Sequence, residues 1–108
     1  MSVEIAAVGG YGEVGRNMTA VKVGKDVVLF DMGLHMPNYV KLTEEEEASP
    51  VKALDEAKLR RAQAIPDDRS ISDWRSMVRA IVVSHAHLDH LGAVPYVAAK
   101  YEIGRAHV

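Results

Sequence analysis

The residues best able to carry out chemistry lie in one short segment, Ser84 to His90, with the sequence SHAHLDH. Three imidazoles and one carboxylate, all able to bind a metal ion, fall within its last six residues. Side chains alternate in direction along an extended chain, so His85 and His87 point the same way and can hold one ion. Asp89 and His90 follow where the chain turns, so they can face a second ion beside the first. Nitrogen and oxygen ligands of this kind suit zinc or manganese.

Two alternatives to a catalytic metal site stand beside this interpretation. A single histidine on a surface loop is usually solvated, but four candidate ligands at this spacing favour metal binding. A structural zinc site is the second alternative, and it would be unusual here because the chain has no cysteine. Elsewhere, His35 is expected to be a loop residue and His107 a tail residue, and Glu102 lies outside any recognisable ligand motif.

The elements that must position this segment can be predicted from hydrophobic patterning. Residues 79–84 form an apolar run typical of a buried central strand, and residues 91–101 predict a helix with Pro95 near its first turn. Residues 3–8 predict another strand. Residues 18–30 predict a β-hairpin, with a turn at Gly24-Lys25-Asp26, whose second arm ends just before Asp31.

The interval from about 34 to 77 has a weaker pattern and a dense scatter of charge. Ser49-Pro50 resembles an N-cap followed by proline at the first helical position, which predicts an exposed helix over 51–61. The basic residues of that helix are expected on its outer face rather than on phosphates; they are Lys58, Arg60 and Arg61. The four acids at 44–47 are expected in a solvated loop or a helix start, rather than in an anionic binding feature.

Composition limits the classes of protein that the chain can belong to. At 108 residues, 48% apolar and 26% charged, it is expected to be one small globular unit over 1–108. A net charge of −2 supplies no overall basic field, so composition alone gives no argument for a nucleic-acid partner. No segment has the pattern of a signal peptide or the ~20 apolar residues of a bilayer span. We therefore expect a soluble, cytoplasmic protein with no membrane partner.

The loop GGYGEVGRN, residues 9–17, contains a G-x-G-x-x-G pattern that raises the alternative of dinucleotide binding. Asp31 stands 21 residues after Gly10, close to where a ribose-binding acid is expected. A βαβ unit also needs a crossover helix, whereas residues 16–26 alternate as a strand and then turn. The glycines therefore predict a tight connection between two strands of one sheet, which uses the access of glycine to positive φ.

Three blocks together resemble a known family. The motif His85-x-His87-x-Asp89-His90 is similar to the metal signature of the metallo-β-lactamase fold, and FDMG around Asp31 is similar to its earlier aspartate motif. The sequences around these motifs, VGGYGEVGRNMTAV and IVVSHAHLDHLGAVPYV, resemble ribonuclease J of the β-CASP branch, its archaeal-type members in particular. The resemblance covers roughly residues 3–34 and 78–101.

For the fold, the resemblance implies an α/β αββα sandwich of which this chain is the N-terminal part. That part would contain a β-hairpin sheet, a charged helical excursion, a central strand ending in HxHxDH, and a helix. The β-CASP domain and the downstream metal motifs would lie outside these residues. The resemblance therefore implies half of a dinuclear site, and we expect the 108-residue chain alone to be inactive.

For the activity, the resemblance implies hydrolysis of RNA phosphodiesters, mainly 5′→3′ exonucleolytic and in some relatives also endonucleolytic. Two zinc ions, with manganese as an alternative, would activate water. His85 and His87 would bind one ion, and Asp89 and His90 the other. The catalytic carboxylates would be Asp89 and, as a residue that orients ligands, Asp31. RNA would be the partner, and a homo-oligomer of the complete enzyme is compatible with this reading.

The loop before the second strand is a candidate for substrate contact in the same resemblance. Asn17, or backbone amides such as that of Gly12, would meet the substrate phosphate near the metal edge. Two further functions stay open at this point. One is another hydrolase of the same fold, acting on a thioester, a lactam or a small phosphodiester, because metal ligands do not report the substrate. The other is a metal-binding module without catalysis.

Overall fold

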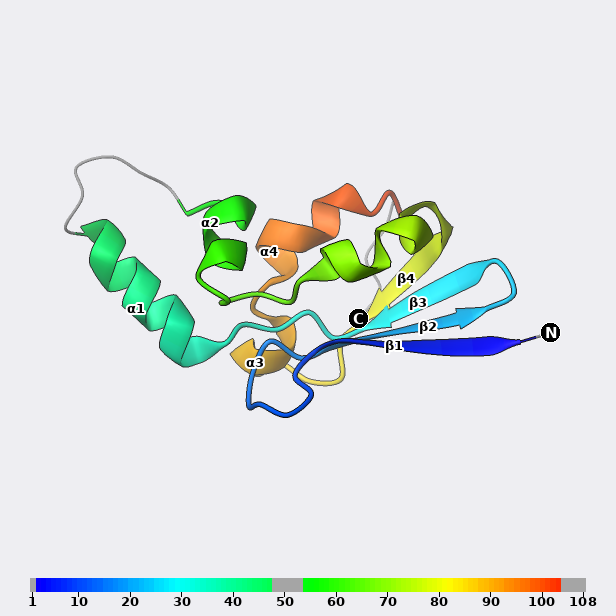
Figure 1. Cartoon of the computed structure of the whole chain (residues 1–108), viewed down its shortest axis with the longest axis horizontal. Helices are drawn as coiled ribbons and strands as arrows, with labels where there is room; N and C mark the ends of the chain where they lie inside the picture. Colours follow the sequence, from blue (N-terminus) through cyan, green and yellow to red (C-terminus); the bar gives the residue numbers. More distant parts are fainter. Residues whose placement is uncertain (1, 48–53, 104–108) are drawn as a thin grey trace.

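The computed structural model describes residues 2–47 and 54–103, and these form a mixed α/β arrangement (Figure 1). A sheet is built first, a helical excursion follows, and the chain then returns to the sheet before ending in short helices. In chain order the elements are β1 (Val3–Gly9), β2 (Met18–Val23), β3 (Asp26–Phe30), α1 (Met36–Glu47), α2 (Glu56–Arg61), the 3₁₀ helix η1 (Asp68–Met77), β4 (Val78–Val82), α3 (Leu88–Leu91), α4 (Val94–Val97) and the 3₁₀ helix η2 (Ala98–Lys100).

The four strands form one sheet in the order β1-β2-β3-β4. Strand β2 is antiparallel to both β1 and β3, which confirms the predicted hairpin and excludes the βαβ unit of a dinucleotide-binding domain. Strand β4 runs parallel to β3. The prediction of a buried central strand is wrong for the described residues: β4 lies at the edge of the sheet, and Val82 at its end is 43% exposed.

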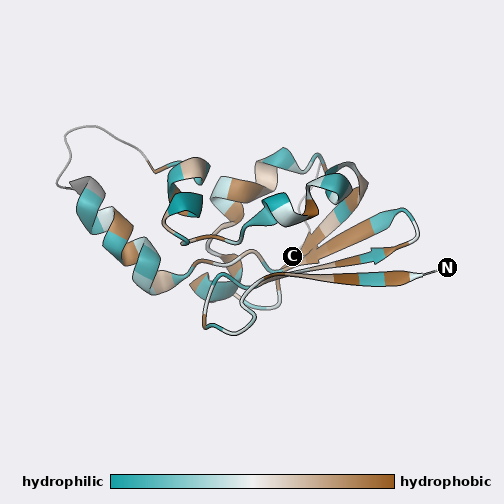
Figure 2. Cartoon of the chain, in the orientation of Figure 1, coloured by the Kyte–Doolittle hydropathy of each residue, from teal (hydrophilic) through white to brown (hydrophobic). Residues whose placement is uncertain are grey.

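The two faces of the sheet have different surroundings. The face toward the helices is buried and packs against α2, η1 and α4; its strand residues include Met18, Ala20, Val27 and Leu29. The helices α2, η1 and α4 lie on one side of the sheet in Figure 2, and the opposite side carries exposed apolar side chains among the described residues. We call it the outer sheet face and define it by five side chains that the strand registers place on one side and that are 36% to 69% exposed: Val3, Ile5, Val23, Phe30 and Val82. The described residues thus contain one sheet of the predicted sandwich.

The helical excursion differs from its prediction in two places. Residues 36–47 form α1, so the acid run lies at the end of a helix rather than at a helix start or in a loop. Helix α2 begins after Asp55, whose side chain accepts a hydrogen bond from the Lys58 backbone N–H at 2.8 Å. The predicted cap at Ser49-Pro50 lies outside the described residues.

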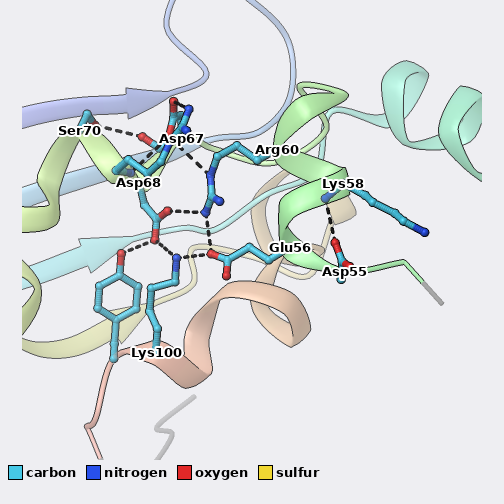
Figure 3. Close-up of polar contacts among 10 residues, drawn as sticks. Asp55, Glu56, Lys58, Arg60, Asp67, Asp68, Ser70 and Lys100 are labelled. Atoms are coloured by element: carbon cyan, nitrogen blue, oxygen red, sulfur yellow. Dashed lines mark hydrogen bonds and ion pairs between the residues drawn. The ribbon is translucent and has the colours of Figure 1, made fainter. Parts of the chain in front are cut away.

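A buried carboxylate ties the excursion to the end of the chain (Figure 3). Asp68 is 3% exposed and accepts hydrogen bonds from Lys100 Nζ at 2.8 Å, Tyr101 Oη at 2.6 Å and Arg60 Nη2 at 3.1 Å. Glu56 pairs with both cations. Arg60 therefore belongs to a partly buried ion-pair network, not to the outer helix face as predicted.

This network sets the charge state of its members. Burial alone would raise the pKa of Asp68, but hydrogen bonds from Lys100 and Tyr101 and the nearby positive charges outweigh it and hold the pKa below its usual range. Burial, and then the hydrogen bond to Asp68, raise the pKa of the Tyr101 hydroxyl well above its usual value. Asp68 therefore stays ionised and Tyr101 protonated, which is the pairing that their hydrogen bond requires.

The predicted helix over 91–101 is present but is divided into shorter pieces. Helical structure starts earlier, at Leu88, breaks at Gly92-Ala93 and resumes in α4 and η2. Pro95 stands in the first turn of α4, as predicted. Across the described ranges 2–47 and 54–103, no helix has the length and apolar character needed to cross a lipid bilayer.

Candidate metal centre

The centre forms where two neighbouring strands end. Strands β3 and β4 are parallel, so their carboxyl ends meet at one edge of the sheet. Asp31 follows β3 directly, and its backbone N–H donates to the carbonyl of Val82, the last residue of β4, at 2.8 Å. The chain after β4 then carries the histidine segment past Asp31. Sheet topology thus brings together two motifs that are more than fifty residues apart in sequence.

Three of the four predicted ligands gather in one group. Ligand atoms of His85, His87 and Asp89 all lie within 4.8 Å of one another. The rings of His85 and His87 stand edge to face with centroids 4.8 Å apart, so the two histidines converge as the extended spacing predicted. Both are exposed, and Asp89 is half-buried. Two imidazoles and one carboxylate form a donor set that fits zinc or manganese.

His90, the fourth predicted ligand, is held beside this group by Asp31. Its Nδ1 lies 2.8 Å from Asp31 Oδ2, and its ring centroid lies 4.0 Å from that of His85. Burial would raise the pKa of Asp31, but hydrogen bonds from the Ser84 backbone and from His90 outweigh it and lower the pKa. An ionised carboxylate can only accept, so His90 Nδ1 donates to Asp31, and in the neutral ring Nε2 then carries the lone pair, with Asn17 Nδ2 at 3.5 Å from it. His90 Nε2 is 3.6 Å from Asp89 Oδ2.

Ser84 is a member of the centre that the sequence reasoning did not identify. Its backbone N–H donates to Asp31 Oδ1 at 2.7 Å, and its hydroxyl lies 2.9 Å from Asp31 Oδ2. The same hydroxyl is 3.0 Å from His85 Nδ1. Ser84 thus connects the carboxylate that orients His90 to the first histidine of the motif. Its place between the apolar strand and the motif was the only available signal.

Asn17 holds the ligand loop from the other side. Its backbone N–H and its side-chain Nδ2 both donate to the Asp89 carbonyl, at 3.2 and 2.8 Å. A side chain at Gly10 would displace Asn17, because its Cβ would lie 2.4 Å from Asn17 Oδ1. A Cβ at Gly33 would lie 1.7 Å from the Asp89 carbonyl oxygen. Gly33 therefore allows the backbone of the ligand loop to approach the end of β3 closely, and Gly10 leaves room for the Asn17 side chain that holds this loop.

The conformation of the glycine loop agrees with its prediction. Gly10, Gly12 and Gly15 have φ values of 88°, 79° and 115°. These values lie in a region that favours glycine, so the loop makes the tight connection between β1 and β2. Asp31 also has a positive φ of 66°. That left-handed turn redirects the chain at the end of β3.

The remaining candidate ligands lie elsewhere. His35 Nδ1 accepts a hydrogen bond from the Asn38 backbone N–H at 3.2 Å, so this loop histidine caps the start of α1. Glu102 is exposed in a separate hollow beside Arg75 and Lys100. His107 lies outside the described residues. Within the part of the chain that the structure describes, the candidate ligands that meet are those of the HxHxDH segment.

The amino-acid sequence assigns the chain to a known protein superfamily. Residues 11–108 match the Metallo-beta-lactamase superfamily, and the chain belongs to that superfamily. This confirms the fold class predicted from the strand-end HxHxDH motif.

Within the superfamily, the chain is similar to ribonuclease J, as predicted. It is 44% identical to Ribonuclease J of Methanocaldococcus jannaschii over 101 residues, which cover 94% of this chain and 22% of that protein. Identity to Ribonuclease J of Pyrococcus abyssi is 44% over 99 residues, or 92% of this chain and 21% of that protein. For Ribonuclease J of Helicobacter pylori it is 32% over 95 residues, or 88% and 11%. The chain spans about a fifth of the length of the first two relatives.

Proposed function

We propose that this protein is a metal-dependent ribonuclease that hydrolyses RNA phosphodiester bonds. The observation that carries the proposal is the convergence of His85, His87 and Asp89 just after the carboxyl end of β4. The chain that contains them is 44% identical to two ribonucleases J. The finer activity is 5′→3′ exonucleolytic, with endonucleolytic cleavage as a second mode. The cytoplasm is the proposed compartment, and a homo-oligomer the proposed assembly.

The donor set supports a site for two zinc ions, with manganese as the alternative. Bound there, such a pair would lower the pKa of a water molecule and neutralise charge that develops on the phosphate. His85 and His87 would hold one ion, and Asp89 and His90 would hold the other. The ligand atoms of Asp89 and of the first two histidines all lie within 4.8 Å of one another, which supports neighbouring positions for the two ions.

The chain's own residues fix the orientation of these ligands. Asp31 holds the proton of His90 on Nδ1 and thereby keeps Nε2 available, and the Ser84 N–H fixes Asp31 in turn. Asp89 and Asp31 are the proposed catalytic carboxylates, the first as a ligand beside the reacting phosphate and the second through its hold on His90.

Substrate contacts by Asn17 and Gly12 stay predictions. The Asn17 amide donates to the Asp89 carbonyl, which favours a positioning role for this side chain. Gly12 is exposed, and no described residue outside its immediate chain neighbours lies within 4 Å of the position that its Cβ would occupy. That a β-CASP domain and further metal ligands complete the enzyme, and that the 108-residue chain alone is inactive, also stay predictions.

The test is hydrolysis of a 5′-monophosphorylated RNA by the full-length protein, with Zn²⁺ or Mn²⁺ added after chelation. We expect metal-dependent release of nucleotides from the 5′ end, and loss of that activity in His85→Ala and His87→Ala. His35→Ala is the matched control, because this histidine caps α1 and is expected to keep activity. Activity that persists in chelator, or that survives His85→Ala, would contradict the proposal.

A further inference from the structure

A hollow of about 500 Å³ opens beside the candidate metal centre. One wall contains His87 and Asp89, two of the proposed ligands. The rest is largely aliphatic. We call this part the apolar hollow and define it by five residues: Val14, Met36, Pro37, Ala86 and Leu88. It brings together the glycine loop, the start of α1 and the start of α3.

The apolar side chains at its rim are exposed although they are large. Val14 is 84% exposed and Leu88 is 50% exposed. Leaving such groups in water forgoes the stabilisation that burial of apolar surface gives. Single exposed aliphatic residues are common, but here they border one hollow that also contains metal-ligand candidates.

The loop that carries Val14 is attached to the segment before α1 by the residues that follow Val14. The Arg16 backbone N–H donates to the Leu34 carbonyl at 2.9 Å, and Arg16 Nη2 donates to Glu13 at 3.1 Å. Gly15 packs so closely that a Cβ there would lie 3.0 Å from the His35 Cα. The residues that follow Val14 are therefore anchored to the segment before α1, which limits where the loop can present Val14.

We propose that the apolar hollow receives the base of the nucleotide whose phosphate lies at the metal centre. This inference rests on the proposed function, since it assumes a nucleotide phosphate beside His87 and Asp89. Both residues also line the hollow, so a phosphate held there places its own sugar and base at the aliphatic wall.

The chemistry of the wall also indicates how the base is recognised. Every base presents an apolar face, and contacts with that face tolerate all four bases. Base identity is read by hydrogen bonds to base edges. None of the five residues of the apolar hollow has a hydrogen-bonding side chain. The hollow therefore adds affinity for nucleotides without selecting a base, which suits an enzyme that degrades RNA of any sequence.

The test measures binding of small phosphates to the full-length protein loaded with Zn²⁺, by calorimetry. AMP and UMP carry a base, whereas ribose 5-phosphate does not, and none of the three has a phosphodiester bond to cleave. We expect AMP and UMP to bind roughly tenfold tighter than ribose 5-phosphate, the effect of burying ~50 Å² of apolar surface. AMP and UMP should differ from each other by less than about threefold.

Two variants test where that difference arises. Val14→Ser should weaken AMP and UMP binding about threefold, and Val14→Ser with Leu88→Ser should bring both to the level of ribose 5-phosphate. Ribose 5-phosphate binding should stay unchanged in both. Val40→Ser is the matched control, since Val40 is 44% exposed on α1 and does not line the hollow.

The outcomes separate the inference from the proposed function. Equal binding of AMP, UMP and ribose 5-phosphate would overturn the base site alone, as would an unchanged preference in the double variant. A hollow filled by another part of the protein would give that same result. If none of the three phosphates binds the metal-loaded protein, the proposed function fails and the base site fails with it.

Discussion

Asp31→Asn is the sharpest test of how the metal centre is organised, because it replaces an ionised carboxylate by a neutral amide of the same shape. Asparagine tolerates the left-handed φ of 66° at this position, so the fold is expected to persist. The amide oxygen of the variant can still accept a hydrogen bond from the Ser84 backbone N–H, which lies 2.7 Å from Asp31 Oδ1 in the wild type. Its NH₂ group then faces His90 Nδ1, 2.8 Å from the present position of Oδ2. An amide can only donate there, so His90 must carry its proton on Nε2.

A protonated Nε2 cannot bind a metal ion, and the free energy of metal binding falls accordingly. Loss of a residue that orients a ligand costs about 10- to 100-fold in metal affinity, or about 1.4–2.7 kcal/mol. The assay is Zn²⁺ binding in competition with a chelator, together with ¹⁵N shifts that report which nitrogen of His90 is protonated. Asp26→Asn is the matched control, since Asp26 begins β3 and pairs with Arg79 at the opposite end of the strand. Equal Zn²⁺ affinities of the two variants, or a proton that stays on Nδ1, would refute the reasoning.

Two further predictions concern stability and packing. Asp68→Ala should lower the free energy of unfolding, measured by urea denaturation, by about 2–4 kcal/mol, because buried cationic partners lose their carboxylate. Asp73 is an exposed carboxylate on the same 3₁₀ helix, and Asp73→Asn should change this free energy by less than about 0.5 kcal/mol. Folding lowers the pKa of Asp68, so the stability that its ionised carboxylate contributes is present above about pH 4 and is lost as the pH falls through the folded pKa. The difference in free energy of unfolding between wild type and Asp68→Ala should therefore shrink in acid. A difference that stays constant with pH would contradict this. Gly33→Ala should displace the Asp89 backbone and weaken Zn²⁺ binding, whereas Gly24→Ala, with open space around its Cβ, should cost only the backbone strain of about 1 kcal/mol. Equal Zn²⁺ affinities in the two glycine variants would show that the ligand loop does not depend on this close approach.

Features set by local chemistry could be predicted from the sequence. Alternation identified β2 and β3, and the glycine pattern identified a turn that needs positive φ. The two-residue spacing of His85 and His87 predicted their convergence. Asp31 could be placed beside the motif only through resemblance, because the parallel pairing of β3 and β4 has no local signature.

Other features depend on long-range contacts and escaped prediction. Helix α1 ends in acidic residues, which oppose the helix dipole, so the run at 44–47 favoured a helix start instead. Asp68 and Lys100 are 32 residues apart, and neither stands in a pattern that marks it as buried. The apolar run at 79–84 predicted a central strand, but the described residues give β4 a partner on one side only.

The outer sheet face includes the ends of the two strands that carry the metal centre, so a contact on this face can affect the centre. Phe30 and Val82, two of its exposed residues, end the strands β3 and β4 from which the centre is built. Asp31 follows Phe30 directly and donates its N–H to the Val82 carbonyl. A layer that buries these side chains would stabilise the strand ends in the geometry that the ligands require. Covering the face and binding metal would then be thermodynamically coupled, so that each event strengthens the other by the same free energy.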